Sequence, residues 1–359
     1  MTLPSVLVAI LDFFKFLWTL FTADSPKPIR FVNPSLSIKQ FRLLDLPSLA
    51  HDVIFSDMST EELYHLSKFS RRSRYAVKMF TRRQKYRFDI TASKSFCSLN
   101  ISNRFGRKTV YRTWKSLDSI KPHEGFPFNT YSPGLWAEAK KEIAYFLDVF
   151  TKKVNCLHFY DTTNVKKMTE FLKEQTALQV NWVWYEVKEM DDNVYKYVLR
   201  EFRDVKELSI CASPSAYFRF YNMEPLTSDF VTIEDADWLT VDNLTRCFTN
   251  VKRVRLSTTR NRCLNVLVFN QFLNAWRNGL KVGELHLEWG CTNFDLQSIF
   301  WNVPTTEVKR VKVGNWRNVS NNRKYFLIRQ KESGEEALVY INFFFTFMNR
   351  PSICFTTNF

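Results

Sequence analysis

The sequence predicts an α/β protein in which three short helices precede a leucine-rich-repeat-like β/α solenoid with a C-terminal β-hairpin. Three observations carry this prediction. A Val-x-x-φ-x-φ motif, where φ is apolar, recurs between about 154 and 313. Between the copies, apolar residues recur with the spacing of a helix. Residues 41–80 have a helical pattern as well. The 359 residues suffice for two domains, and a hydrophobic content of 45% supplies a core.

Residues 1–38 are predicted to be an apolar amphipathic N-terminal segment followed by a Pro-containing linker. The run SVLVAILDFFKFLWTLF at 5–21 is interrupted by Asp12 and Lys15. Each charge would cost about 2.5–3.5 kcal/mol at the centre of a membrane-spanning helix. The run therefore predicts an amphipathic helix that packs on the protein or lies on a membrane surface, and membrane contact of residues 1–22 stays open.

Residues 39–84 are predicted to hold three short helices. The dipeptide Leu46-Pro47 suits the start of the first helix, because proline fits the first turn. Ser59 and Glu62 have the spacing of a capping box, in which each side chain satisfies a free backbone N–H group of the second helix. A basic S-R-R-x-R sequence at 70–74 opens the third helix.

These helices resemble an F-box, on the sequence FRLLDLPSLAHDVIFSDMSTEELYHLSKFSRRSRYAVKMF at 41–80. An ordinary helical hairpin is the alternative. Residues 85–359 resemble the F-box-associated domain of the nematode-expanded F-box proteins, on VKELSI (205–210), VKRVRLSTTR (251–260), FNQFLNAWRNG (269–279) and the terminal FLIRQKESGEEALV. Ala50 and His51 depart from the commoner approach to the first F-box helix.

The resemblance implies a substrate-recognition subunit of an SCF-type E3 ubiquitin ligase, which is not itself an enzyme. The F-box would dock on a Skp-family adaptor and through it on a cullin. The C-terminal domain would bind a protein substrate for ubiquitin-dependent degradation. An apolar stripe on the short helices is expected to stay exposed and to form the adaptor interface. Its residues are Leu46, Pro47, Val53, Ile54, Met58, Leu63 and Leu66.

The motif begins at positions 154, 180, 205, 251, 282 and 308, so most intervals match the repeat length of leucine-rich solenoids. A chance recurrence among many valines is the alternative. We expect a mainly parallel sheet whose inner row is Leu157, Val183, Leu208, Val254, Leu285 and Val311. The long interval after 205 is interpreted as an inserted loop. The segment 325–348 predicts a β-hairpin with Gly334 in the turn, which would cap the end of the sheet.

Alternation along each strand places the residues between the apolar positions on an open face. This face is the predicted substrate surface, and opposite charges on adjacent strands could alternatively form a mere ladder of ion pairs. Two outward tryptophans on one strand favour binding, because tryptophan is enriched at binding hot spots. The predicted substrate residues are Trp182, Trp184, Glu207, Arg253, Arg255, Glu284 and His286, with Arg310 and Lys312 on the last strand.

The sequence carries no glycine-rich phosphate loop and no recognisable catalytic or zinc motif, so no catalytic residue, metal or cofactor is predicted. Seven widely spaced cysteines predict free thiols in a cytoplasmic or nuclear protein. The net charge of +15 and a basic run at 68–87 leave one further function class open. That alternative is a basic repeat scaffold that binds RNA or an anionic membrane surface, although the aromatic residues within the run fit helix packing better than nucleic acid.

Overall fold

The computed structural model describes residues 43–102, 108–114, 128–131, 134–151, 153–162, 164–175, 180–258, 266–288, 296–308, 324–342 and 352–357. The N-terminal segment 1–38 and its predicted helix therefore lie outside the described residues. The chain divides into two compact units, 1–46 and 47–359. In the first unit the described part is a 3₁₀ helix, Leu43–Asp45. Within the described ranges, no helix has both the length and the hydropathy that crossing a bilayer would require.

Three helices open the second unit: α2 (Ser48–Asp57), α3 (Thr60–Phe69) and α4 (Arg71–Arg83). The predicted capping box is confirmed, since Ser59 Oγ accepts from the Glu62 N–H and the Glu62 carboxylate accepts from the Ser59 N–H at 2.6 Å. A second capping box, between Ser70 and Ser73, starts α4. Both boxes satisfy donors that the first turn of a helix leaves free, so three short helices can follow one another without a long loop.

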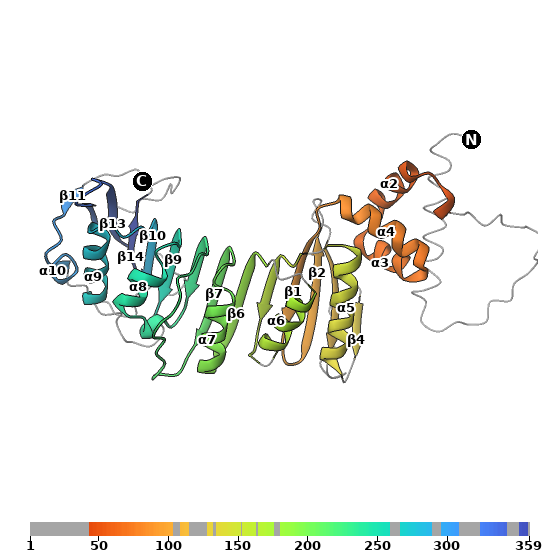
Figure 1. Ribbon diagram of the computed structural model, residues 1–359, viewed down its shortest axis with the longest axis horizontal. Coiled ribbons are helices and arrows are strands. Elements are labelled where there is room, and N and C mark those ends of the chain that lie inside the picture. The colour runs from red at the N-terminus through yellow and green to blue at the C-terminus, as the bar shows by residue number, and fades with distance from the viewer. Residues whose placement is uncertain are drawn as a thin grey trace, which may run out of the picture. The chain divides into compact units, whose positions relative to one another are not determined.

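The rest of the unit is an α/β fold built on a large mixed sheet that does not close on itself (Figure 1). Fourteen described strands follow the order β11-β12-β13-β14-β10-β9-β8-β7-β6-β5-β1-β2-β3-β4. Strands β1 (Arg87–Ala92), β2 (Phe96–Ser102) and β3 (Lys108–Trp114) form an antiparallel meander. A short strand, β4 (Phe128–Tyr131), pairs parallel to β3.

Six parallel strands form the centre of the sheet, and β1 pairs parallel to the first of them. They are β5 (Cys156–Phe159), β6 (Trp182–Glu189), β7 (Glu207–Ser213), β8 (Phe230–Ile233), β9 (Arg253–Ser257) and β10 (Glu284–Glu288). Their pairing register aligns Leu157, Val183, Leu208, Val231, Val254 and Leu285 in one row, and all six are buried. The predicted inner row is thus confirmed for the described strands, with Val231 as an addition.

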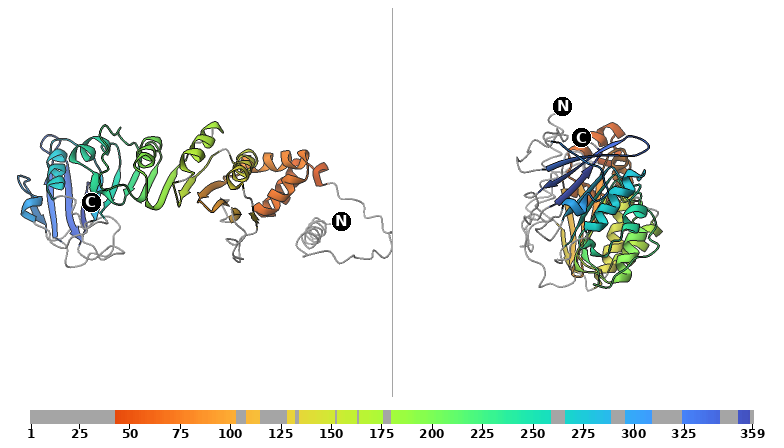
Figure 2. Two further views of the ribbon diagram at one scale, coloured as in Figure 1. Left: turned by 90° about the horizontal axis from the view of Figure 1, so that it is seen from below. Right: turned by 90° about the vertical axis from the view of Figure 1, so that its left-hand side faces the viewer.

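Helices connect these strands and cover one face of the sheet (Figure 2). They are α5 (Leu135–Val149), α6 (Val165–Glu174), α7 (Asp192–Glu201), α8 (Val241–Cys247) and α9 (Val266–Arg277). Asp191 caps α7 by accepting hydrogen bonds from the backbone N–H groups of Asn193 and Val194. Because every helix packs on the same face, the opposite face of the strands carries side chains that alternate with the core.

The inserted loop predicted after 205 is wrong, because β8 lies there and pairs with both β7 and β9. The repeat begins at Ser228, so the 46-residue interval is two intervals of 23 residues (205 to 228 and 228 to 251). Ser228 stands where the other copies have valine, and it is buried with its hydroxyl donating to the Arg203 carbonyl at 3.2 Å. A hydroxyl group that makes a hydrogen bond can occupy a core position. This copy of the repeat therefore does not match a pattern that requires an apolar residue there.

The last predicted copy is also misplaced. Its described part is β11 (Thr306–Val308), which pairs antiparallel with β12 at the edge of the sheet and not with β10. Arg310, Val311 and Lys312 lie outside the described residues. The neighbour of β10 is instead β14 (Ser352–Thr356), an antiparallel strand that the sequence did not predict.

The C-terminal hairpin is confirmed as β12 (Lys324–Arg329) and β13 (Glu336–Asn342). Gly334 has a φ of +71° in the turn. Residues with a Cβ atom adopt this backbone conformation only at a cost in free energy. The hairpin reaches the parallel strands through β14, since β13 pairs with β14 and β14 pairs with β10. A short helix, α10 (Leu296–Ile299), precedes the hairpin in the chain. The Asn270 side chain of α9 donates a hydrogen bond to the Ile299 carbonyl at 2.9 Å.

The inner row of the sheet should dominate stability. Truncating Leu208, which is 1% exposed, to alanine removes buried methyl groups and leaves a cavity, so we expect a loss of about 2–5 kcal/mol in the free energy of unfolding. Urea denaturation of the purified chain measures this. Ser209→Ala is the matched control one residue along the same strand, on the open face, and should change the free energy by less than about 0.5 kcal/mol. Equal effects of the two substitutions would contradict the assignment of the faces.

Candidate functional site

Four of the residues predicted for the adaptor interface belong to the internal core. Ile54, Met58, Leu63 and Leu66 are each at most 9% exposed, so the expectation that the whole apolar stripe stays free is wrong. The physical reason is that the helices pack on one another and on α5, because α4 lies against α2, α3 and α5. The Tyr64 ring stacks on Phe146 of α5 with 5.1 Å between the ring centroids.

Polar contacts fix the same helices to α5. The Tyr64 hydroxyl donates to the buried Glu142 carboxylate at 2.9 Å, and Lys68 Nζ lies 3.2 Å from the same carboxylate. Ser67 Oγ and the Tyr145 hydroxyl are 2.7 Å apart. Burial and the neighbouring Glu142 charge raise the pKa of Tyr64. The hydroxyl therefore keeps its proton and remains a donor to Glu142.

A smaller apolar surface does remain exposed on α2 and α4. Leu49 and Val53, one helical turn apart on α2, are 78% and 53% exposed, and on α4 Tyr75 and Met79 have the same spacing. Two charged residues join the helices, because both guanidinium N–H groups of Arg83 donate to the Asp52 carboxylate at 2.6 and 2.7 Å. Of the predicted residues, Pro47 and Val53 are exposed and Leu46 is half-buried. The sequence interpretation missed Leu49, Tyr75 and Met79, although their i, i+4 spacing was visible.

The basic run on α3 and α4 is partly neutralised within the chain. Asp148 of α5 accepts a hydrogen bond from Arg74 at 2.8 Å and another from Lys78. These two cations hold the pKa of Asp148 below its usual value, although burial acts in the opposite direction. Arg83 pairs with Asp52 and Lys68 with Glu142. Several of the charges that suggested nucleic acid thus pair within the chain, where α3 and α4 pack against α2 and α5.

The predicted substrate residues share the open face of the sheet. Trp182 and Trp184 are 38% and 46% exposed, so both remain accessible, although the Arg87 guanidinium lies over the Trp182 ring at 5.0 Å and His158 stacks on Trp184. Arg253 is exposed, whereas the other four predicted residues, Glu207, Arg255, Glu284 and His286, are half-buried. The expected charge ladder is interrupted, because β8 separates Glu207 from Arg253 and the Arg253 guanidinium lies over the Phe230 ring at 4.9 Å.

Aromatic rings form a row across this face, from β2 to β6. The Phe96 and Tyr160 centroids are 6.3 Å apart, those of Tyr160 and His158 4.2 Å apart, and those of His158 and Trp184 5.1 Å apart. The last pair is stacked, with planes 16° apart. Alternation along β5 places His158 and Tyr160 on the same face, but only the pairing of β5 with β6 brings Trp184 beside His158.

A hollow opens beside Trp184, at the carboxyl ends of β6 and β7. It is lined by Trp184, Glu186, Val187, Lys188, Cys211, Ala212, Ser213 and Glu234. Glu186 is also 3.3 Å from His158 Nε2, measured from its Oε2 atom. Burial raises the pKa of the Cys211 thiol, and the Glu234 carboxylate raises it further. The Cys211 thiol therefore stays protonated and lines the hollow as a neutral group, not as a nucleophile.

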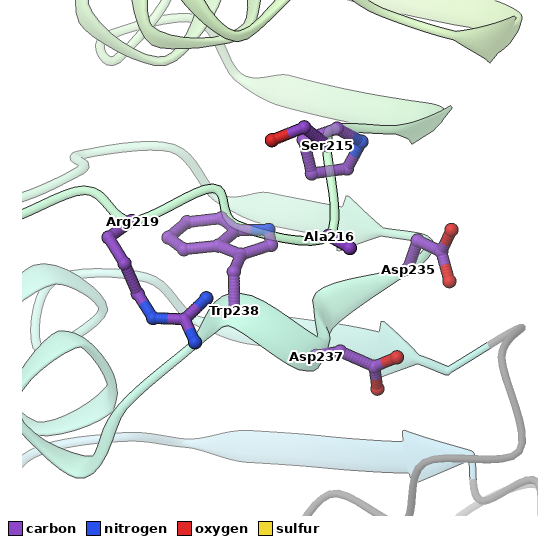
Figure 3. Close-up of a pocket in the computed structure, with 7 residues that line it drawn as sticks. Ser215, Ala216, Arg219, Asp235, Asp237 and Trp238 are labelled. Carbon is purple, nitrogen blue, oxygen red and sulfur yellow. The ribbon is translucent and has the colours of Figure 1, made fainter.

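A second, smaller hollow adjoins the first through the Ser213 hydroxyl, which donates to the Asp235 carboxylate. Figure 3 shows the Asp235 and Asp237 carboxylates on one side of the Trp238 indole and the Arg219 guanidinium on the other. Asp235 has a φ of +56°, a conformation that is uncommon without glycine. In the described ranges, no group of three or more His, Cys, Asp or Glu residues could hold a metal ion. The five described cysteines are free thiols.

Comparisons with known proteins place the chain in no group. No family model matches the sequence, no curated protein matches it, and no solved structure matches the fold.

The histidine in the aromatic row should titrate below the usual range. Burial lowers the pKa of His158, and the opposing effect of Glu186 is smaller. Because the folded state binds this proton less tightly than the unfolded state, whose pKa is about 6.5, the contribution of His158 to stability is fully present above that pH. It should decrease as the pH falls through 6.5 toward the lower folded pKa. NMR titration, with His158→Gln to assign the signal, measures this, and a folded pKa at or above 6.5 would contradict it.

Proposed function

We propose that the chain is a substrate-recognition subunit of an SCF-type E3 ubiquitin ligase. Helices α2–α4 form an F-box that docks on a Skp-family adaptor and through it on a cullin. The β/α region is a leucine-rich-repeat-like solenoid with a C-terminal hairpin, and it holds a protein substrate. The chain itself catalyses no reaction. The observation that carries the proposal is the F-box-like sequence at 41–80, in which a capped middle helix follows the Leu46-Pro47 start and precedes the S-R-R-x-R sequence.

The exposed side chains of α2 and α4 support docking of a helical partner. Leu49 and Val53 present an apolar strip, with Tyr75 and Met79 on the neighbouring helix. Exposed apolar groups of this kind mark interaction surfaces, and methionine adapts its shape to a partner. The Asp52–Arg83 pair holds the two helices in one arrangement. A pre-formed surface binds with less loss of conformational entropy than a flexible one.

The open face of the parallel strands is the proposed substrate surface. Its strands alternate buried side chains with exposed or half-buried ones, several of them aromatic or charged, while the helices occupy the other face. Such a surface offers aromatic anchors, with Trp182 and Trp184 as the largest. Rigid strands hold these anchors in place, so a substrate meets a surface that needs little rearrangement.

The second candidate is a basic scaffold for RNA or an anionic membrane surface. One observation favours it, a hollow in which Arg82, Lys85, Arg87 and Lys153 surround a floor that includes Asn155 and Asn181. Phosphate groups would suit these cations. Against it, Arg87 lies over the Trp182 ring at 5.0 Å, and Asp148 contributes a negative charge to the same hollow. Co-purification discriminates: the ligase proposal requires a Skp-family protein in stoichiometric amount, and the scaffold requires nucleic acid or lipid.

The adaptor surface can be tested without disturbing the core. Leu49→Ala with Val53→Ala removes exposed side chains only, so the chain should fold normally while its adaptor affinity falls by at least about ten-fold. Pull-down and calorimetry with a purified Skp-family adaptor measure the loss. Tyr217→Ala is the control, because Tyr217 is 91% exposed in the distant loop after β7. Unchanged adaptor binding by the double variant, or no binding by the wild-type chain, would sink the proposal.

A further inference from the structure

The row of aromatic rings on the open face stops at Trp184, although the sheet continues. In the pairing register, Trp184 of β6 lies opposite Ser209 of β7, and Glu186 lies opposite Cys211. Both β7 side chains are small and half-buried. Adjacent strands are about 4.8 Å apart, so a small residue on β7 leaves one position of the row empty between β6 and β8. One face of the Trp184 indole therefore borders the hollow instead of another ring.

The hollow is negatively charged, in contrast to the chain as a whole. Glu186 and Glu234 line it, and Lys188 is the single cation among the eight residues of its lining, all of which the structure describes. The Glu234 N–H donates to the Ile210 carbonyl, which continues the β7–β8 register and places Glu234 across Cys211 from Glu186. An aromatic ring, two carboxylates and small polar side chains thus line one space.

We propose that this hollow binds an arginine side chain of the protein substrate, with the guanidinium stacked on Trp184 and hydrogen-bonded to Glu186 and Glu234. A guanidinium is planar, stacks on aromatic rings and donates in a fork that matches carboxylates. It would occupy the empty position of the aromatic row. A lysine ammonium lacks the flat shape, so it would gain the charge attraction without the stacking. An apolar side chain would leave two carboxylates without a partner in a partly desolvated site.

The neighbouring groups support the same ligand. His158 is on the other face of Trp184, and because burial lowers its pKa it is neutral at neutral pH. It therefore leaves the charge of Glu186, which is 55% exposed at its side chain, available to a ligand. Lys188 is exposed at the rim and could enter the hollow itself. Removing Lys188 should then strengthen binding of a cationic ligand, whereas removing either carboxylate should weaken it.

The inference deepens the proposed function by naming the substrate class, and it rests on that function only in taking the ligand to be part of a degradation substrate. The full chain is labelled with 5-fluorotryptophan, and Trp184→Phe assigns the Trp184 signal in ¹⁹F NMR. N-acetyl-arginine methylamide is titrated against its isosteric neutral analogue, N-acetyl-citrulline methylamide. We expect a saturable shift of the Trp184 signal with the arginine compound and at least about ten-fold weaker binding of the citrulline compound.

Variants locate the binding to the hollow. Glu186→Gln with Glu234→Gln should weaken binding of the arginine compound by at least about ten-fold, while Lys188→Ala should tighten it. Glu174→Gln is the matched control, because Glu174 is an exposed carboxylate on α6, outside the lining of the hollow and away from the open face. Equal shifts with citrulline, or no effect of the double variant, would overturn the inference. Adaptor binding by Leu49→Ala with Val53→Ala is measured separately. The result for arginine binding can therefore be interpreted even if the ligase proposal fails.

Discussion

The structure depends on one constraint, the common register of the six parallel strands. Each pairs with the next without a shift at the row that runs from Leu157 to Leu285, so every inward position meets the helices and every alternate position faces away. A shift of one residue in any strand would move its apolar side chains out of the core. The core and the open face are therefore two consequences of the same pairing. A change of register on one strand would damage both at once.

Much of this arrangement could be predicted from the sequence, because a strand buried on one face repeats its apolar residues every second position. The pattern located five of the six parallel strands and failed at β8, where Ser228 replaces valine and satisfies its hydroxyl within the core. It also assigned β11 to the parallel run. Periodicity reports which residues are buried but not which strand lies beside which, and β14, inserted next to β10 from the end of the chain, is a long-range pairing that no local pattern contains.

The helical hairpin illustrates the same limit at the candidate site. The sequence interpretation grouped the apolar residues of 46–66 as one stripe, but α2 divides them, because Ile54 faces the core and Val53 faces away from it. The pattern also could not tell whether the partner is another protein or another part of the chain. For α3 part of the partner is α5, about 75 residues further on, through Tyr64, Glu142 and Phe146. Leu49 and Val53 were left exposed because they lie on the other side of α2 from Ile54 and Phe55, which face the core. Which apolar residues are free for an adaptor is thus decided by tertiary packing.

The open face shows how a binding site can form where one strand carries only small side chains. His158 and Trp184 are predictable as outward residues from alternation, yet their stacking follows only from the β5–β6 register. The small residues Ser209 and Cys211 carry no signal in the sequence of β7 by themselves. They matter because β7 places them beside the last ring of the row, between two strands that each carry a glutamate. The gap is a property of three strands together, so its shape and charge become visible only when the register that builds the core has been established.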